Sequence, residues 1–160
     1  MGCEWEQVIL GDLCTKIGSG ATPRGGKKSY KNEGISLIRS QNVLDYSLSI
    51  NGLAYIDEQE AKALENVTIQ KGDVLLNITG DSVARACIVP SSVLPARVNQ
   101  HVMILRPNID MLNNGFLLYL LQYYKPHLLS VASSGATRNA LTKAMIENFS
   151  FLCPPLFIQE

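Results

Sequence analysis

The residues best suited to chemistry in this chain are amide, hydroxyl and guanidinium groups that stand beside predicted turns. In duplex DNA, arginine reads guanine and asparagine or glutamine reads adenine, with about 1–3 kcal/mol of discrimination for each paired contact. Hydroxyl and lysine groups bind phosphate. The pattern favours duplex DNA over single strands, which bind on exposed aromatic platforms. The candidate DNA-binding residues are Arg24, Lys27, Lys28, Tyr30, Arg39, Gln41, Asn42, Asp81, Ser82, Arg85, Asn99, Gln100 and Arg138.

Each of these residues also has a structural alternative. Short polar side chains in loops commonly satisfy nearby backbone groups instead of binding a partner. Any one of these side chains is therefore as suited to holding a loop in place as to reading a base. The residue types alone do not separate the two roles.

One glycine-rich stretch resembles a nucleotide-binding P-loop but departs from it at the decisive positions. Gly20 to Gly25 is followed by Gly26, where the motif requires lysine. The register that uses Lys27 begins with Ala21 and ends in Lys28, so the hydroxyl that would hold magnesium is missing. The sequence therefore argues against nucleotide binding here.

Two other catalytic patterns are equally incomplete. Glu60 and Lys62 have the spacing of magnesium nucleases, with Asp45 or Asp57 upstream, but they fall in a predicted helix with alternating charge. A solvated helix face is the simpler interpretation, and a metal-dependent nuclease stays the alternative. His101 and His127 have no ligand or catalytic partner at a suitable spacing. We therefore expect no catalytic centre, no metal and no cofactor.

The elements that must position the polar groups follow one another irregularly. The central feature is a predicted hairpin, with strands over residues 73–79 and 82–89, a turn at Gly80-Asp81, and Pro90 as its end. Further strands are predicted over residues 35–39, 53–56, 97–106 and 149–153. Helices are predicted over residues 13–17, 57–64, 110–124, 127–132 and 141–148, and polar loops over residues 18–30 and 133–139. This order indicates an α+β or mixed α/β class, and we expect an α+β fold: a single mixed domain with a twisted β-sheet and short helices.

Charge is balanced overall but unevenly distributed. The 160 residues carry 14 basic and 14 acidic side chains, which argues against a generic polyanion binder. Basic residues gather over residues 16–39 and acidic residues over 45–73, which is compatible with one basic and one acidic face. A basic face is what contacts to DNA phosphates require.

The compartment is predicted from what the sequence contains. No apolar run approaches the roughly 20 residues that span a bilayer, and the first residues do not form a signal peptide. Cys3, Cys14, Cys87 and Cys153 do not have metal-site spacing, and we interpret them as reduced thiols. We therefore expect a cytoplasmic protein of one domain, with no membrane contact.

Taken in order, the motifs resemble the target recognition domain of the specificity subunit of type I restriction-modification systems. The resemblance covers nearly the whole chain, and its ordered set is specific although each motif alone is weak. The residues that carry it are Trp5, Leu10 to Asp12, Gly18 to Pro23, Tyr30, Ile38 to Val43, Gly72 to Gly80, Ile88 to Pro90, Val98 to Val102, Arg106-Pro107, Gly135 to Arg138, Leu141, Ile146, Phe149, Pro154 to Leu156, and Gln159.

The resemblance implies a non-catalytic DNA reader. In the family, each of two such domains reads one half of a split DNA sequence, and long helices bind two modification (methyltransferase) subunits and set the spacing. The methyltransferase and restriction active sites lie in other subunits. The resemblance therefore implies duplex DNA and the modification and restriction subunits as partners, with a possible homodimer. A fragment that docks on the methyltransferase without reading DNA is the alternative.

The resemblance also divides the chain and its polar residues. Residues 1–153 would form the recognition domain and residues 154–160 the start of a spacer helix, so the chain would be a fragment or a half-length subunit lacking the long helix. Motifs shared by readers of different sequences cannot select bases, so Thr22, Asn77 and Thr79 are expected to be scaffold residues. Base reading is expected over residues 24–31, after Asn42 and near Asp81. Ala84 stands where the family pattern has glycine, which predicts that this position needs less backbone freedom here.

Overall fold

A computed structural model describes residues 4–136 and 139–160 of the chain. Its centre is a four-stranded antiparallel sheet in the order β2-β10-β7-β8. The strands are β2 (Cys14–Ser19), β10 (Val102–Pro107), β7 (Val74–Asn77) and β8 (Ala86–Ile88). Side chains of a strand point alternately to the two faces of its sheet. Val74 and Leu76 accordingly enter one hydrophobic core while Leu75 enters another, so β7 is buried on both faces.

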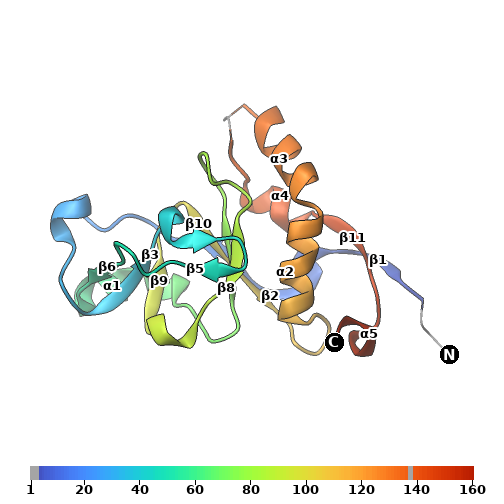
Figure 1. The fold of residues 1–160 in the computed structure, drawn as a ribbon, viewed down its shortest axis with the longest axis horizontal. Coiled ribbons are helices and arrows are strands. Elements are labelled where there is room, and N and C mark those ends of the chain that lie inside the picture. Colours follow the sequence, from blue (N-terminus) through green and yellow to red (C-terminus); the bar gives the residue numbers. More distant parts are fainter. Residues whose placement is uncertain (1–3, 137–138) are drawn as a thin grey trace.

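The two cores are covered by different layers (Figure 1). On one side lies a three-stranded sheet in the order β6-β3-β9, together with the short helix α1 (Glu58–Ala63). Its strands are β6 (Ala54–Ile56), β3 (Ile35–Ile38) and β9 (Ala96–Val98). The other core is covered by helices and by the strand pair β1 (Glu6–Ile9) with β11 (Ser150–Cys153).

The helices of the second layer begin and end where the sequence supplies caps. They are α2 (Asn114–Tyr123), α3 (Lys125–Ser134), α4 (Lys143–Glu147) and α5 (Leu156–Gln159). The side chain of Asn113 accepts a hydrogen bond from the Phe116 backbone at 2.9 Å and caps α2. Pro126 is placed in the first turn of α3, where its missing N–H costs nothing.

Smaller elements complete the chain. A two-stranded hairpin is formed by β4 (Val43–Leu44) and β5 (Ser47–Leu48). Single 3-10 turns lie at η1 (Leu10–Asp12), η2 (Gly26–Ser29), η3 (Ser40–Asn42), η4 (Glu65–Val67) and η5 (Ser91–Val93). The expected α+β class is confirmed, with the strands distributed over several sheets.

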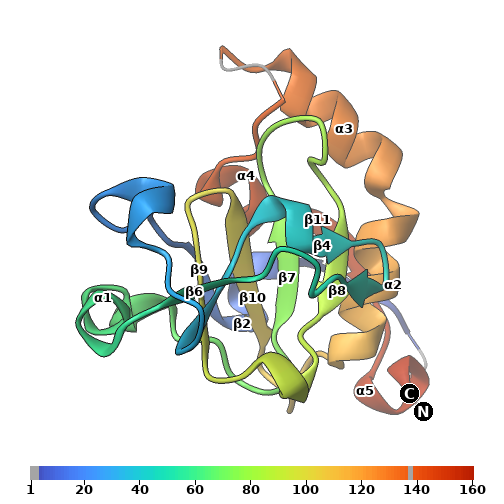
Figure 2. The same ribbon diagram turned by 60° about the vertical axis from the view of Figure 1, so that its left-hand side comes forward.

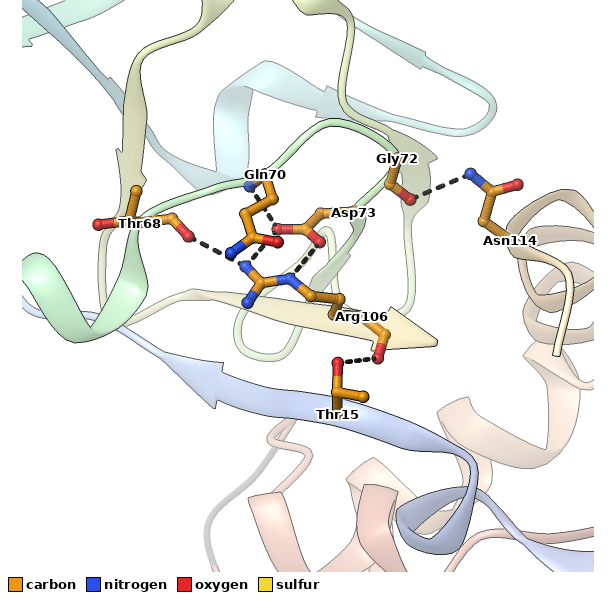
Figure 3. A network of polar contacts seen from close by, with 7 residues as sticks. All are labelled: Thr15, Thr68, Gln70, Gly72, Asp73, Arg106 and Asn114. Atoms are coloured by element: carbon orange, nitrogen blue, oxygen red, sulfur yellow. Dashed lines mark hydrogen bonds and ion pairs between the residues drawn. The ribbon is translucent and has the colours of Figure 1, made fainter. Parts of the chain in front are cut away.

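A buried ion pair closes one end of the central sheet (Figure 3). The guanidinium of Arg106 donates from Nε to Asp73 Oδ1 at 2.8 Å and from Nη2 to Asp73 Oδ2 at 2.9 Å. Nη2 also donates to the Thr68 carbonyl at 3.0 Å, and Asp73 Oδ2 accepts from the Gln70 backbone at 2.7 Å. This clamp ties the last turn before β7 to the end of β10.

Several predicted elements are confirmed by the structure. Antiparallel pairing of β7 with β8 confirms the hairpin, and Asp57 caps α1 through a 2.8 Å bond from the Glu60 backbone. Strands at 35–39, 53–56 and 149–153 appear as β3, β6 and β11, while α2, α3 and α4 match the three predicted apolar helices. The hairpin strands are shorter than predicted, and the loop between them spans residues 78–85.

Two element predictions were wrong. Residues 13–17 were expected to be helical, yet most of them belong to β2, which adds to the edge of the sheet by pairing with β10. Residues 97–106 were expected to form one strand, yet they contribute to β9 and β10 in different sheets. The chain turns at Asn99, whose Oδ1 accepts from the His101 backbone at 2.9 Å and competes with strand continuation.

The expectation for Ala84 was also wrong. Its φ is +73°, in the left-handed region that glycine adopts most easily, and its side chain is fully buried. The Ala84 N–H donates to the Asn77 carbonyl at 2.9 Å. The position therefore keeps the backbone conformation of a glycine although the residue is alanine.

Candidate nucleic-acid interface

Most of the predicted DNA-binding residues gather at the end of the central sheet opposite the Arg106–Asp73 clamp. Asn77 at the end of β7 pairs with Val102 at the start of β10, and Ser19 at the end of β2 pairs with Met103. The segments that leave these strand ends therefore emerge together, as Figure 2 shows. We call residues 20–30, 39–42, 78–85 and 99–101 the loop rim.

The loop rim is joined to the sheet by the buried side chain of Asn77. Its Nδ2 donates to the Ser40 carbonyl at 2.9 Å and to Ser82 Oγ at 3.0 Å. Its backbone N–H donates to the Arg85 carbonyl at 2.9 Å. Because Asn77 has no exposed surface, it fixes η3 against the β7–β8 loop and is not itself open to a partner.

Asn99 performs a similar task between β9 and β10. Its N–H donates to the Ile38 carbonyl at 3.1 Å, and its carbonyl accepts from the Gly20 N–H at 3.0 Å. A side chain at Gly20 would meet the Val98 carbonyl oxygen at 1.8 Å, so only glycine lets this loop cross the strand end. Through these bonds Asn99, which is only 6% exposed, holds three segments together.

Two side-chain pairs link the loops to each other. Thr79 Oγ1 lies 2.5 Å from Nδ1 of His101, and the Ile78 N–H donates to the His101 carbonyl at 3.0 Å. Thr22 Oγ1 donates to Gln100 Oε1 at 2.5 Å. Residues 20–30, 78–85 and 99–101 are therefore one hydrogen-bonded unit, and residues 39–42 are joined to it through the side chain of Asn77.

Arg39, Tyr30 and Asn42 support the same unit from the η3 side. Arg39 Nη2 donates to the Gly52 carbonyl at 2.6 Å, and its guanidinium lies 5.1 Å from the centre of the Tyr30 ring. Asn42 is fully buried; its Oδ1 accepts from the Arg39 N–H at 3.0 Å, and its Nδ2 donates to the Ser49 carbonyl at 3.0 Å. These three side chains are engaged with the protein itself.

The remaining candidates are placed differently. Seven are exposed on the loop rim, and Ser82 is half-buried beneath them with its Oγ bonded to Asn77. Arg138 lies outside the described residues. The exposed set is Arg24, Lys27, Lys28, Gln41, Asp81, Arg85 and Gln100.

The carboxylates that suggested a nuclease have structural roles: Asp57 and Glu60 cap a helix together, and Asp45 bonds residues of α2 and α3. Glu60 Oε1 accepts from the Asp57 N–H at 3.2 Å, completing a capping box at α1. Asp45 instead bonds Lys125 Nζ at 2.5 Å and Gln122 Nε2 at 2.8 Å. Burial raises the pKa of Asp45, but these two donors outweigh it and hold that pKa below its usual value. In the parts of the chain that the structure describes, no three His, Cys, Asp or Glu side chains gather as metal ligands would.

The described thiols have no nucleophilic activation. Burial raises the pKa of both Cys14 and Cys87 to about 12, and it raises that of Cys153 as well. Their reactive thiolate form is therefore scarce at neutral pH. Over residues 4–136 and 139–160, no helix is long and apolar enough to cross a membrane.

Sequence reasoning missed one group of exposed residues next to the loop rim. Three tyrosine side chains are 53% to 78% exposed: Tyr119 and Tyr123 on α2, and Tyr46 in the β4–β5 turn. The spacing of four residues between Tyr119 and Tyr123 was the available signal, because it places both on one helix face. It was hidden by the strongly apolar character of the whole helix.

Comparison with known proteins identifies the family. The family model described as the type I restriction modification DNA specificity domain matches residues 3–160. The chain belongs to this family. Proteins of this family are in general not catalysts themselves but the specificity components of restriction-modification complexes. The resemblance inferred from the motifs is thus confirmed.

The relatives and solved structures agree with this assignment. A putative type I restriction enzyme MjaX specificity subunit of Methanocaldococcus jannaschii is 20% identical over 98% of this chain and 37% of its own length. The HsdS subunit from Thermoanaerobacter tengcongensis shares the fold with a TM-score of 0.71 at 23% identity, over 99% of this chain and 35% of that one. The S subunit from M. genitalium has a TM-score of 0.67 at 12% identity, over 98% of this chain and 36% of that one. The chain therefore spans little more than a third of each of these proteins.

Proposed function

We propose that this specificity domain reads one half of a bipartite sequence in duplex DNA for a type I restriction-modification complex, and that it catalyses no reaction itself. The observation that carries the proposal is the loop rim, in which buried amides join the segments that carry the exposed basic and amide side chains. A rigid arrangement suits base reading, because loops and side chains that are already ordered lose little conformational freedom when they bind. The proposal extends the family assignment to the action of these particular residues.

Roles on the loop rim follow from exposure and chemistry. Arg24, Lys27 and Lys28 contact phosphates, since their exposed charges lie together around η2. Gln41, Gln100, Arg85 and Asp81 present their groups to base edges, where glutamine suits adenine, arginine suits guanine and aspartate suits cytosine. Arg39, Tyr30, Asn42, Ser82 and Asn99 position the loops, although all five were first considered as direct contacts.

The larger assembly is part of the same proposal. The partners are the modification and restriction subunits, in the cytoplasm, where the free thiols of Cys14, Cys87 and Cys153 would stay reduced. Residues 154–160 form the start of a spacer helix after a recognition domain over residues 1–153. Supporting this, Gln159 anchors α5 by accepting from the Asn113 N–H at 2.7 Å and donating to the Pro154 carbonyl at 3.0 Å. A helix that continues from α5 therefore leaves the domain in a fixed direction.

Selection of bound sequences from a random duplex library tests the function directly. We expect enrichment of a short motif of a few base pairs, and binding that weakens steeply as salt rises. Library members should bind unequally at every salt concentration. Equal affinity for all sequences, or no binding to duplex DNA at low salt, would contradict sequence reading by this domain.

A further inference from the structure

One side chain of the loop rim has no role in the proposed function and can be either uncharged or positive. His101 stands at the turn between β9 and β10, next to the exposed Gln100. Figure 2 shows this turn at the same end of the central sheet as the loop between β7 and β8. Imidazole is the side-chain group that ordinarily changes charge between pH 5 and 8. His101 therefore adds a pH-dependent group to the surface that the proposed function turns toward DNA.

The protein holds His101 through its backbone and through its ring. Its N–H donates to Asn99 Oδ1 at 2.9 Å, and its carbonyl accepts from the Ile78 N–H at 3.0 Å. In the ring, Nδ1 lies 2.5 Å from Thr79 Oγ1. A hydroxyl both donates and accepts, so this bond suits the neutral ring as well as the imidazolium. The orientation of the ring is therefore kept while its charge changes.

The second ring nitrogen, Nε2, is the atom available to a partner. His101 is half-buried, and within residues 4–136 and 139–160 the ring is bonded through Nδ1 alone. That part of the chain buries two unpartnered side-chain polar atoms, Arg39 Nε and Asn77 Oδ1, and Nε2 is not one of them. Nε2 is therefore open to solvent at the loop rim.

The charges of the loop rim indicate which group of DNA the ring meets. Asp81 is the one acidic residue in the rim segments, so the rim as a whole suits phosphates. A phosphate gains most from imidazolium, because a hydrogen bond between two charged groups is stronger than one to an uncharged base edge. The basic residues of the rim segments are Arg24, Lys27, Lys28, Arg39 and Arg85.

These observations give His101 a part in binding. We propose that His101 contacts a DNA phosphate through Nε2 and takes up a proton from solvent as DNA binds. The inference rests on the proposed function and adds pH as a control of its affinity. The proton stays on the ring, where it supplies both the charge and the hydrogen that Nε2 donates. Binding is therefore tighter in the more acidic half of the neutral range.

DNA titrations at fixed ionic strength test the proposal. Affinity should rise by about threefold or more as the pH falls from 8 to 6, since uptake of one whole proton gives about tenfold per pH unit. Titration calorimetry at pH 7 in phosphate and in Tris buffer counts the protons directly, because the two buffers release protons with different enthalpies. Selected and random duplexes should show the same uptake, because a phosphate contact does not depend on sequence.

Two variants at His101 separate the charge from the structural bond. His101→Asn places an amide where Nδ1 stood, which suits the bond to Thr79 but leaves nothing at Nε2. His101→Gln places an uncharged donor near Nε2. Both variants should lose the pH dependence and the proton uptake, while thermal melting shows that they stay folded. His127→Asn, at the other histidine, exposed on α3, should behave as the wild-type chain does.

The outcomes divide this inference from the proposed function. Binding to duplex DNA without proton uptake would overturn the role of His101 alone. So would an unchanged pH dependence in a folded His101 variant, or its loss in the His127 variant. Uptake with the selected duplex but not with random duplex would overturn the phosphate contact in favour of a base. Absence of any binding to duplex DNA would overturn both the proposed function and this inference.

Discussion

The amide of Asn77 donates to two segments at once, and both are parts of the surface that we propose faces DNA. Ser40 belongs to η3, and Ser82 belongs to the loop between β7 and β8. Neither segment is held by the regular hydrogen bonds of a sheet at these points. A single buried side chain therefore sets the distance between Gln41 on one side and Asp81 on the other.

Replacing this amide should damage DNA reading more than it damages the fold. Asn77→Ala leaves the Ser40 carbonyl without its donor, which costs about 1–3 kcal/mol of unfolding free energy. Affinity for the selected duplex should fall, while affinity for random duplex stays, because the phosphate-binding side chains are unchanged. Urea unfolding and DNA titration measure the two effects. Asn66→Ala, on an exposed residue of η4, is the matched control. Equal losses for selected and random DNA would contradict a positioning role.

Ala84 allows a second test at the scale of one residue. In a helix, exchanging a buried alanine for glycine costs about 1 kcal/mol in backbone terms alone. At Ala84 the φ of +73° favours glycine over alanine. This gain in backbone energy offsets the loss of the buried methyl group. Ala84→Gly should therefore change the unfolding free energy by less than about 1 kcal/mol. Ala132→Gly, at a fully buried position of α3, should cost clearly more. Similar costs at both positions would argue against strain at Ala84.

At the scale of elements, the Asp73–Arg106 pair joins the start of β7 to the end of β10. Its two members differ in burial: the side chain of Asp73 is fully buried, while that of Arg106 keeps 22% of its exposure. Removing the arginine leaves a buried carboxylate without its counter-charge. Removing the aspartate leaves a guanidinium that can turn toward solvent.

The two single variants should therefore differ in a defined order. Arg106→Ala should lower the unfolding free energy by about 3–5 kcal/mol, and Asp73→Ala by less. The double variant should be less damaged than the sum of the two. Denaturant unfolding of all three variants measures this coupling. DNA binding at a permissive temperature should be unaffected, because the clamp lies at the far end of the sheet. A larger loss for Asp73→Ala would contradict the argument from burial.

The predictions made from the sequence succeeded where local signals decide structure. Asp57 is a good helix cap in isolation, and α2 follows from its apolar run. The predictions failed where contacts between residues distant in sequence decide the structure. Most of residues 13–17 belong to a strand because β10 pairs with them. The same limit applies to the site. Asn42 and Gln41 are neighbours of similar chemistry, yet one is fully buried and the other exposed, and nothing local distinguishes them.

At the scale of the whole molecule, zero net charge means that DNA affinity depends on where the charges lie. The exposed Lys27 and Lys28 belong to η2, and no acidic residue lies between Asp12 and Glu33. On α1, in contrast, the basic Lys62 stands beside the acidic Glu58 and Glu60. We therefore expect a local electrostatic contact, with little attraction between DNA and the remaining surface.

Charge reversal at two sites tests this distribution. Lys27→Glu/Lys28→Glu should weaken binding to every duplex. It should also reduce the slope of log affinity against log salt by about two, since each phosphate contact contributes roughly one. Lys62→Glu/Lys71→Glu reverses two exposed charges away from the rim and should change the slope little. Equal effects of the two double variants would indicate binding through overall charge.

The attachment of the glycine-rich loop has a consequence for altering the protein. The backbone of Gly20 bonds the Asn99 carbonyl, and that of Lys31 bonds the Tyr55 carbonyl at 2.9 Å. Between these anchors only Tyr30, next to the second anchor, packs half-buried against a core. The part of the segment before Tyr30 is thus exchangeable: inserts of other sequence or length can be grafted between Gly20 and Tyr30 while the two cores stay intact. New DNA specificities could be obtained here by transplantation, without redesign of the domain.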